Sequence, residues 1–161
     1  MNNPEGQLSL FIKEEDVEEY NIAEKGFGYS QILPIILMLW QVYERLTAMR
    51  HASQSTVIVT IEQPELHLHP RLQAKLMDAF IAVVNEAKVK GLNMCFIIET
   101  HSQNMVNRLG LKIARKEYDP DDATILLFHE PNANRPSPQV ATYDNEGFLT
   151  NWPIGFFDPE D

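Results

Sequence analysis

Two apolar runs in the sequence end in side chains that can bind a metal ion or activate water. Residues 56–61 are mostly β-branched and are followed directly by Glu62, with Glu65 close behind. Residues 94–98 form a second apolar run, and His101 follows it. Runs of this composition are typical of strands that are covered on both faces of a parallel sheet. Ligands of such sheets bind just past the carboxyl ends of the strands, so the sequence predicts a ligand site there.

The carboxylate of Glu62 has two interpretations. It follows six residues that carry no charge, and a carboxylate buried at a strand end is costly unless it meets a cation, a proton or a hydrogen-bond donor. Mg²⁺ is one such cation, because one or two carboxylates often hold it beside nucleotide phosphates. The alternative is a side chain that leaves the sheet and lies in water. The residue alone does not decide between the two.

Helical patterns surround these runs. A glycine-containing loop at residues 24–31 leads into a helical pattern over residues 30–50, with Pro34 in its first turn, where proline is tolerated. The start of this helix is apolar on almost every side, so we expect it to be buried inside a larger body. Residues 71–88 have the period of a helix with one apolar face. Ser102 is expected to cap a third helix.

The C-terminal part has strand patterns at residues 123–129 and 139–143, and the turn at residues 144–147 predicts a hairpin. The order strand, helix, strand, helix, strand predicts an α/β fold with a largely parallel sheet. Cys95 lies within the apolar run 94–98, so we expect it to be buried and chemically inert.

Composition restricts the class of protein and its partners. The chain has 161 residues, enough for one domain, and a formal net charge of −10. An acidic surface repels phosphate backbones, so direct DNA binding by this chain is disfavoured. A single cysteine favours the reducing cytoplasm. The sequence shows no signal peptide and no apolar run long enough to span a membrane.

Several segments together resemble ABC-type ATPases of the AAA family, especially those related to the recombination and overcoming-lysogenization-defect (OLD) ATPases. The string VIVTIEQPE at residues 57–65 resembles their Walker B segment, and LHLHP at 66–70 looks like their D-loop. IIETHS at 97–102 is similar to their switch-histidine loop, and GFGYSQ at 26–31 resembles their signature loop. Residues 139–161 look like the C-terminal cap of a poorly characterised subgroup.

The resemblance implies a P-loop-NTPase-like three-layer sandwich, with residues 1–161 forming a single partial domain, its C-terminal lobe. It also implies Mg²⁺ with ATP as the cofactor, with Glu62 as the metal ligand. Gln63 occupies the position of the catalytic Glu; Gln is no base, although it can orient a water. Glu65 is a candidate replacement base, and His101 would contact the γ-phosphate. The remaining implied nucleotide-binding residues are Gly28, Ser30, Gln31 and His69.

The phosphate-binding Walker A loop of these ATPases is missing. None of the seven glycines precedes a lysine, so the pattern Gly-x-x-x-x-Gly-Lys-Ser/Thr does not occur. By resemblance, the chain would complete a nucleotide site with a Walker A-bearing segment or a homologous subunit. It would then act as an ATP-dependent switch in DNA repair or phage defence.

Two other functions are open at this stage. The missing loop and Gln63 also fit a degenerate, non-catalytic module that pairs with an intact ATPase. The imidazoles of His67, His69 and His101, with the carboxylates of Glu62 and Glu65, are ligands that Zn²⁺ or Mn²⁺ accepts, as in a metallohydrolase.

Overall fold

The computed structural model describes residues 11–12, 20–21, 27–48, 56–128, 138–153 and 157. The chain divides into two compact units, Met1–His101 and Ser102–Asp161. Each unit is described by itself. The acidic segment 14–19 and residues 24–26 of the expected loop lie outside the described residues.

The N-terminal unit contains a short antiparallel pair, β1 (Phe11–Ile12) and β2 (Tyr20–Asn21), and the long helix α1 (Phe27–Ala48). The helix predicted over residues 30–50 is present, but the loop expected at residues 27–29 is wrong, because α1 already begins at Phe27. Glycine weakens a helix by only about 1 kcal/mol relative to alanine, so two glycines do not prevent one from forming. In the described part of the chain, no helix is long and apolar enough to cross a membrane.

The apolar start of α1 is largely uncovered. Leu39 is buried, whereas Trp40 is 59% exposed and Ile36 and Leu37 are nearly half exposed. The expectation of a helix buried on almost every side is therefore wrong for this chain by itself. The pattern still indicates a covering body, since such a run of apolar side chains is unusual on a helix that faces water.

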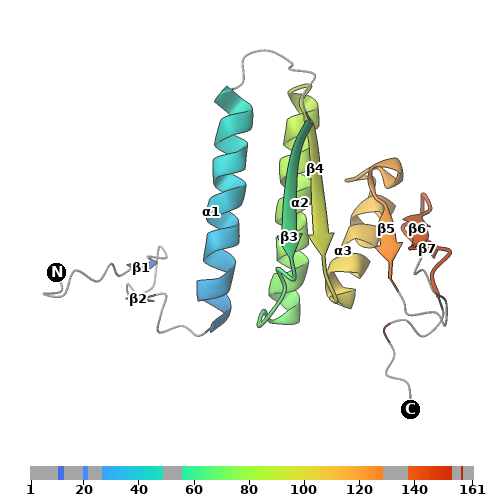
Figure 1. Cartoon of the computed structure of the whole chain (residues 1–161), viewed down its shortest axis with the longest axis horizontal. Helices are drawn as coiled ribbons and strands as arrows, with labels where there is room; N and C mark the ends of the chain where they lie inside the picture. Colours follow the sequence, from blue (N-terminus) through green and yellow to red (C-terminus); the bar gives the residue numbers. More distant parts are fainter. Residues whose placement is uncertain are drawn as a thin grey trace, which may run out of the picture. The chain divides into compact units, whose positions relative to one another are not determined.

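Two parallel strands and the helix between them form the centre of the N-terminal unit (Figure 1). Strand β3 (Thr56–Glu62) leads into α2 (Pro70–Val89), and β4 (Asn93–Glu99) returns beside β3 in parallel. This β–α–β unit confirms the α/β prediction. Helix α2 buries the apolar face that its period predicts, at Leu76, Met77, Phe80, Ile81, Val84 and Ala87. At the far end from the candidate site, Val42 of α1 packs against a cluster centred on Ala87 and Leu92.

The β3–β4 sheet is covered on one face only. The rings of Phe80 in α2 and Phe96 in β4 lie 5.0 Å apart, on the covered face. Exposed and half-buried residues alternate along both strands, and the open face carries Ile58 and Ile97, 59% and 56% exposed. The expectation of strands covered on both faces is wrong for this chain. Cys95 lies on the same open face and is exposed, so its predicted burial is also wrong.

The C-terminal unit is built from α3 (Gln103–Ala114), a short 3-10 helix (Pro120–Asp122) and three antiparallel strands: β5 (Ile125–Leu127), β6 (Gln139–Tyr143) and β7 (Leu149–Thr150). The hairpin prediction is confirmed, because β6 pairs with β7 across the turn. The Ser102 cap is confirmed as well, since its Oγ accepts a hydrogen bond from the Met105 amide at 3.1 Å. These strands are antiparallel, so the parallel arrangement is confined to β3 and β4.

Tyr143 anchors the core of this unit. Its hydroxyl donates to the Val106 carbonyl of α3 at 2.8 Å, and burial raises the pKa of Tyr143 well above its usual range. Trp152 and Phe157 pack against the same core with their rings 5.2 Å apart. Gly110 of α3 and Gly147 of the hairpin turn bring their backbones together: a Cβ on Gly147 would lie 2.0 Å from the Gly110 carbonyl oxygen.

Candidate functional site

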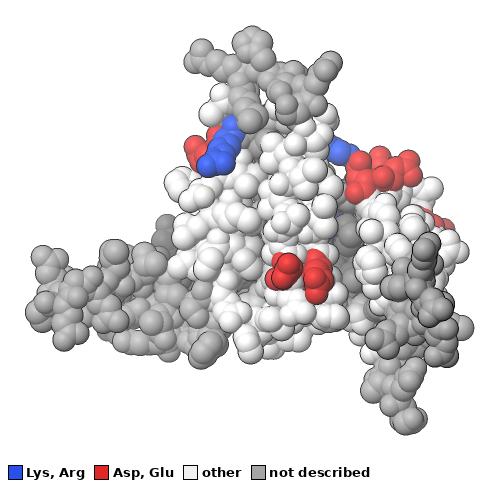
Figure 2. All heavy atoms as spheres, viewed as in Figure 1, with Lys and Arg blue, Asp and Glu red and all other residues white. Residues whose placement is uncertain are grey.

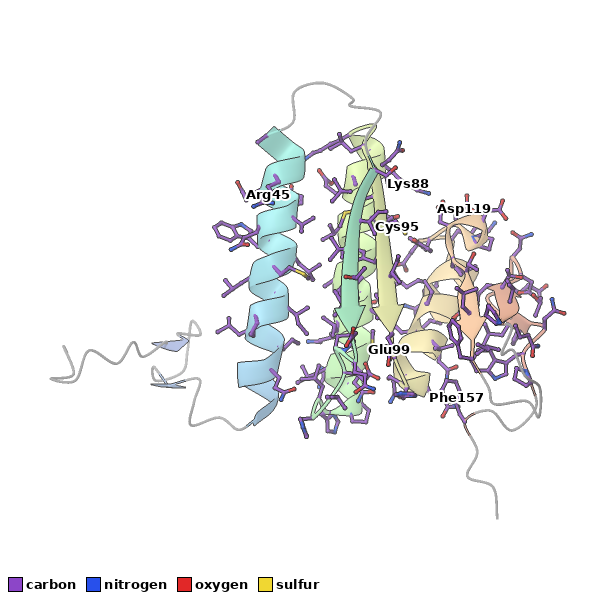
Figure 3. All side chains as sticks on the ribbon, in the orientation of Figure 1. Arg45, Lys88, Cys95, Glu99, Asp119 and Phe157 are labelled. Carbon is purple, nitrogen blue, oxygen red and sulfur yellow. The ribbon has the colours of Figure 1, made fainter. Side chains whose placement is uncertain are left out.

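The carboxyl ends of β3 and β4 bring two carboxylates to one edge of the sheet. Glu62 and Glu99 are register partners in the parallel pair, and both are exposed on the open face. Figure 3 labels Glu99 at the end of β4. On the face drawn in Figure 2, acidic side chains gather at this end of the sheet, with no described Lys or Arg beside them. The edge therefore presents negative oxygen atoms to solvent.

Sequence reasoning identified Glu62 but not Glu99. The signal was available, because each Glu directly follows an apolar run, and parallel pairing places such residues side by side. The structure also changes the physical argument for Glu62. Its side chain is exposed, so burial does not by itself demand a partner for the carboxylate in this chain.

A tight loop follows Glu62. Gln63 and His67 have φ angles of 43° and 60°, a left-handed conformation that non-glycine residues adopt only when their surroundings hold it. The Gln63 amide donates to the Glu99 carbonyl at 2.8 Å, which continues the link between the two strand ends. The Leu66 amide donates back to the Gln63 carbonyl at 3.2 Å. These contacts fix where the loop leaves the sheet.

Glu65 is the buried carboxylate of the site. It is only 6% exposed, and its Oε1 accepts a hydrogen bond from the His101 backbone amide at 2.7 Å. Its Oε2 is buried and has no hydrogen-bond partner. A buried carboxylate oxygen without a donor is costly, so this atom makes Glu65 a candidate site residue.

The histidines of the site have separate surroundings. His101 and His67 are exposed. His69 is the N-cap of α2, and its Nδ1 accepts from the Arg71 amide at 3.2 Å. Within the described ranges, which include every residue of the metallohydrolase interpretation, no group of three His, Cys, Asp or Glu side chains is arranged to hold a metal ion. That interpretation therefore lacks its metal centre.

The remaining predicted residues lie in α1. Gly28 is in its first turn, and Ser30 and Gln31 follow within the helix. Helices α1 and α2 both begin at the end of the unit where β3 and β4 finish (Figure 1). Helix N-termini carry free amides and a partial positive charge, which favour anions. The structure thus brings Glu62, Gln63, Glu65 and His101 together through the two strand ends, with His69 at the start of the next helix.

Comparison with known proteins identifies a family for the N-terminal two thirds of the sequence. Residues 1–106 match a family model described as "AAA ATPase domain". The endonuclease GajA of Bacillus cereus (strain HuB5-5) is 36% identical over 110 residues, which cover 62% of this chain and 15% of that protein. The chain therefore corresponds to a small part of that relative's length. No solved structure gives a significant match. Because the family model covers most of the sequence, including both strand ends and Glu65, the chain belongs to the AAA ATPase domain family.

Proposed function

We propose that this chain supplies the strand-end part of an ATP site, which a Walker A-bearing segment or partner subunit completes. The observation that carries the proposal is the joined end of β3 and β4. There Glu65 accepts the His101 backbone amide, the Gln63 amide donates to the Glu99 carbonyl, and Glu62 lies in register beside Glu99, all within the segment that the family model matches. The buried Glu65 carboxylate holds the backbone of His101, which follows β4. Folding alone does not require this arrangement, because the Oε2 of Glu65 has no partner among the described residues.

The donor set at this edge suits Mg²⁺. Glu62 offers an exposed carboxylate, Glu99 lies beside it in register, and Mg²⁺ prefers a few carboxylates together with water and phosphate oxygens. Glu62 is the residue that would hold the ion, and the ion would neutralise charge on the ATP phosphates. Gln63 would orient a water through its amide group, and the exposed His101 imidazole would meet the terminal phosphate.

The uncovered surfaces support a missing part of the domain. The sequence has no phosphate loop to supply the amides and the lysine that the β- and γ-phosphates need. The open face of the β3–β4 sheet and the Ile36, Leu37 and Trp40 side of α1 are apolar surfaces that a completing segment would cover. A two-stranded parallel sheet also has both edges available for further strands. The P-loop-type three-layer sandwich is the fold that we propose for the completed domain.

The degenerate module is the second candidate. Gln63 stands where the family pattern has a carboxylate, so an ATP site built with this chain could bind nucleotide without hydrolysing it. In both cases we propose an ATP-dependent switch in a cytoplasmic assembly. The resemblance to the recombination and OLD ATPases makes DNA repair and phage defence the first processes to examine.

A paramagnetic metal ion tests the placement of the site. The chain is isotopically labelled, assembled with a phosphate-loop segment of a family member, and given ATP with Mn²⁺ in place of Mg²⁺. The amide signals of Gln63 and Thr100 should broaden strongly. Gly91, in the turn before β4 at the opposite end of the sheet, serves as the control and should stay sharp. Equal broadening at Gly91 and Gln63, or none at either, would reject this site.

A further inference from the structure

Glu65 makes contacts with three separate segments of the N-terminal unit. Its side chain accepts the His101 amide through Oε1 at 2.7 Å. Its backbone carbonyl accepts the Leu68 amide at 3.0 Å and the Gln73 side-chain amide at 3.5 Å. Gln73, in the first turn of α2, also donates to the Leu68 carbonyl at 3.0 Å. One residue therefore links the segment after β4, the loop before α2 and the start of α2.

The bond to His101 is the only one of these contacts that spans a long sequence separation, of 36 residues. A hydrogen bond from an amide to an ionised carboxylate is shorter and stronger than one between neutral groups, and burial protects it from competition by water. Pro64 and Leu68 of the same loop are buried together with Glu65, whereas Leu66 and His67 between them are exposed. A change in the position of the His101 amide therefore alters the hydrogen bond to Glu65 directly.

We propose that Glu65 is a positioning residue that fixes the backbone of His101 to the loop of residues 66–69, and that it does not act as the general base. The catalytic consequence rests on the proposed function, in which His101 meets the terminal phosphate. Through this hydrogen bond, a change at the terminal phosphate that moves His101 also moves the loop that leads into α2. Oε2, which has no donor among the residues that the structure describes, is the second acceptor of the same carboxylate and would take a donor that arrives with the completed site.

Three substitutions separate the geometry of the link from the charge of the carboxylate. Glu65→Gln removes the charge and cannot take up a proton, but its side-chain oxygen can still accept the His101 amide. Glu65→Asp keeps the charge but is one methylene shorter, so it cannot reach the amide without moving the loop. Glu65→Ala removes the acceptor. Since Glu65→Ala could unfold the loop, Glu65→Asp provides the independent test of reach.

Amide hydrogen exchange of the full chain tests the hydrogen bond between Glu65 and His101 without any nucleotide. We expect His101 to keep its protection in Glu65→Gln and to exchange at least about tenfold faster in Glu65→Asp and Glu65→Ala, as expected when a buried hydrogen bond of about 1.4 kcal/mol is lost. The Leu92 amide, which donates to the Ala87 carbonyl at 2.9 Å within the same unit, serves as an internal control for folding and should not change. Unchanged His101 exchange in both Asp and Ala variants would overturn the link.

ATP turnover of the chain assembled with a phosphate-loop segment then separates the two roles. A positioning role predicts that Glu65→Gln keeps kcat within a few-fold of the parent, whereas Glu65→Asp loses kcat with little change in KM. A general base predicts the reverse order, with Glu65→Gln the most damaged, and this would overturn the proposal. If the assembly binds no nucleotide, the proposed function fails, and the exchange result still decides whether the link exists.

Discussion

At the residue scale, the candidate site depends on two carboxylates in different environments. Glu62 is exposed at the end of β3, where an incoming cation can reach it, whereas Glu65 is buried and already accepts a backbone amide. The same side-chain chemistry therefore stands in two environments, one open to solvent and one bonded to the protein backbone. The sequence pattern predicts Glu62 as a metal ligand, and this stays a prediction. It could not predict the Glu65 contact, because a loop with two left-handed residues leaves no periodic signal.

Cys95 provides a residue-scale test of the open sheet face. Its side chain is exposed between Ile58 and Ile97 on β3 and β4, so a maleimide should modify it readily in the native isolated chain. Assembly with a completing segment that covers this face should slow the reaction by an order of magnitude or more, since a covered thiol is shielded from the reagent. Labelling is followed by mass spectrometry. Resistance of Cys95 in the isolated native chain would show that this face is already covered.

At the element scale, the elements with a strong local signal were predicted and those that depend on absent neighbours were not. The apolar period of α2, the Ser102 cap and the turn after β6 were found from the sequence, because each is fixed by nearby residues. The exposure of one face of β3 and β4 was not predicted from the sequence. A β-branched run has the same composition whether one face or both are finally covered, so it indicates the completed sheet rather than this chain.

The contact between α3 and the hairpin turn gives an element-scale prediction. Asparagine tolerates the positive φ of 80° at Gly147, but any Cβ there would lie 2.0 Å from the Gly110 carbonyl oxygen. Gly147→Asn should therefore lower the free energy of unfolding of the C-terminal unit by about 3 kcal/mol or more. The matched control is Gly91→Asn, which has φ of 69° and open space, and should change stability by less than about 0.5 kcal/mol.

Urea unfolding measures both variants. Trp152 fluorescence, in a background with Trp40 replaced by Phe, follows Gly147→Asn in the core of the C-terminal unit, and far-UV circular dichroism follows Gly91→Asn in the N-terminal unit. A Gly147→Asn variant as stable as the Gly91→Asn control would show that the two backbones do not meet as described.

At the scale of the whole molecule, the described part of the N-terminal unit exposes apolar side chains on helix α1 and on one face of the β3–β4 sheet. The proposed function accounts for these surfaces as contacts with the segment that would complete the ATP site. The family was evident in the strand-end segments, which local sequence determines. The absence of the Gly-x-x-x-x-Gly-Lys-Ser/Thr pattern was likewise evident from the sequence. Sequence reasoning placed too many residues in the core because an apolar run indicates burial without showing which part of a protein supplies the cover.

The most direct test of the central claim is the affinity for Mg-ATP, measured by titration calorimetry. The isolated chain should give no measurable heat of binding, because it lacks the loop that contacts the β- and γ-phosphates. The assembly with a phosphate-loop segment should bind Mg-ATP, and Glu62→Ala should weaken this binding at least about tenfold without preventing assembly, as loss of about 1.4 kcal/mol at the metal implies. Tight binding by the chain alone, or equal affinity with and without the Glu62 carboxylate, would contradict the account.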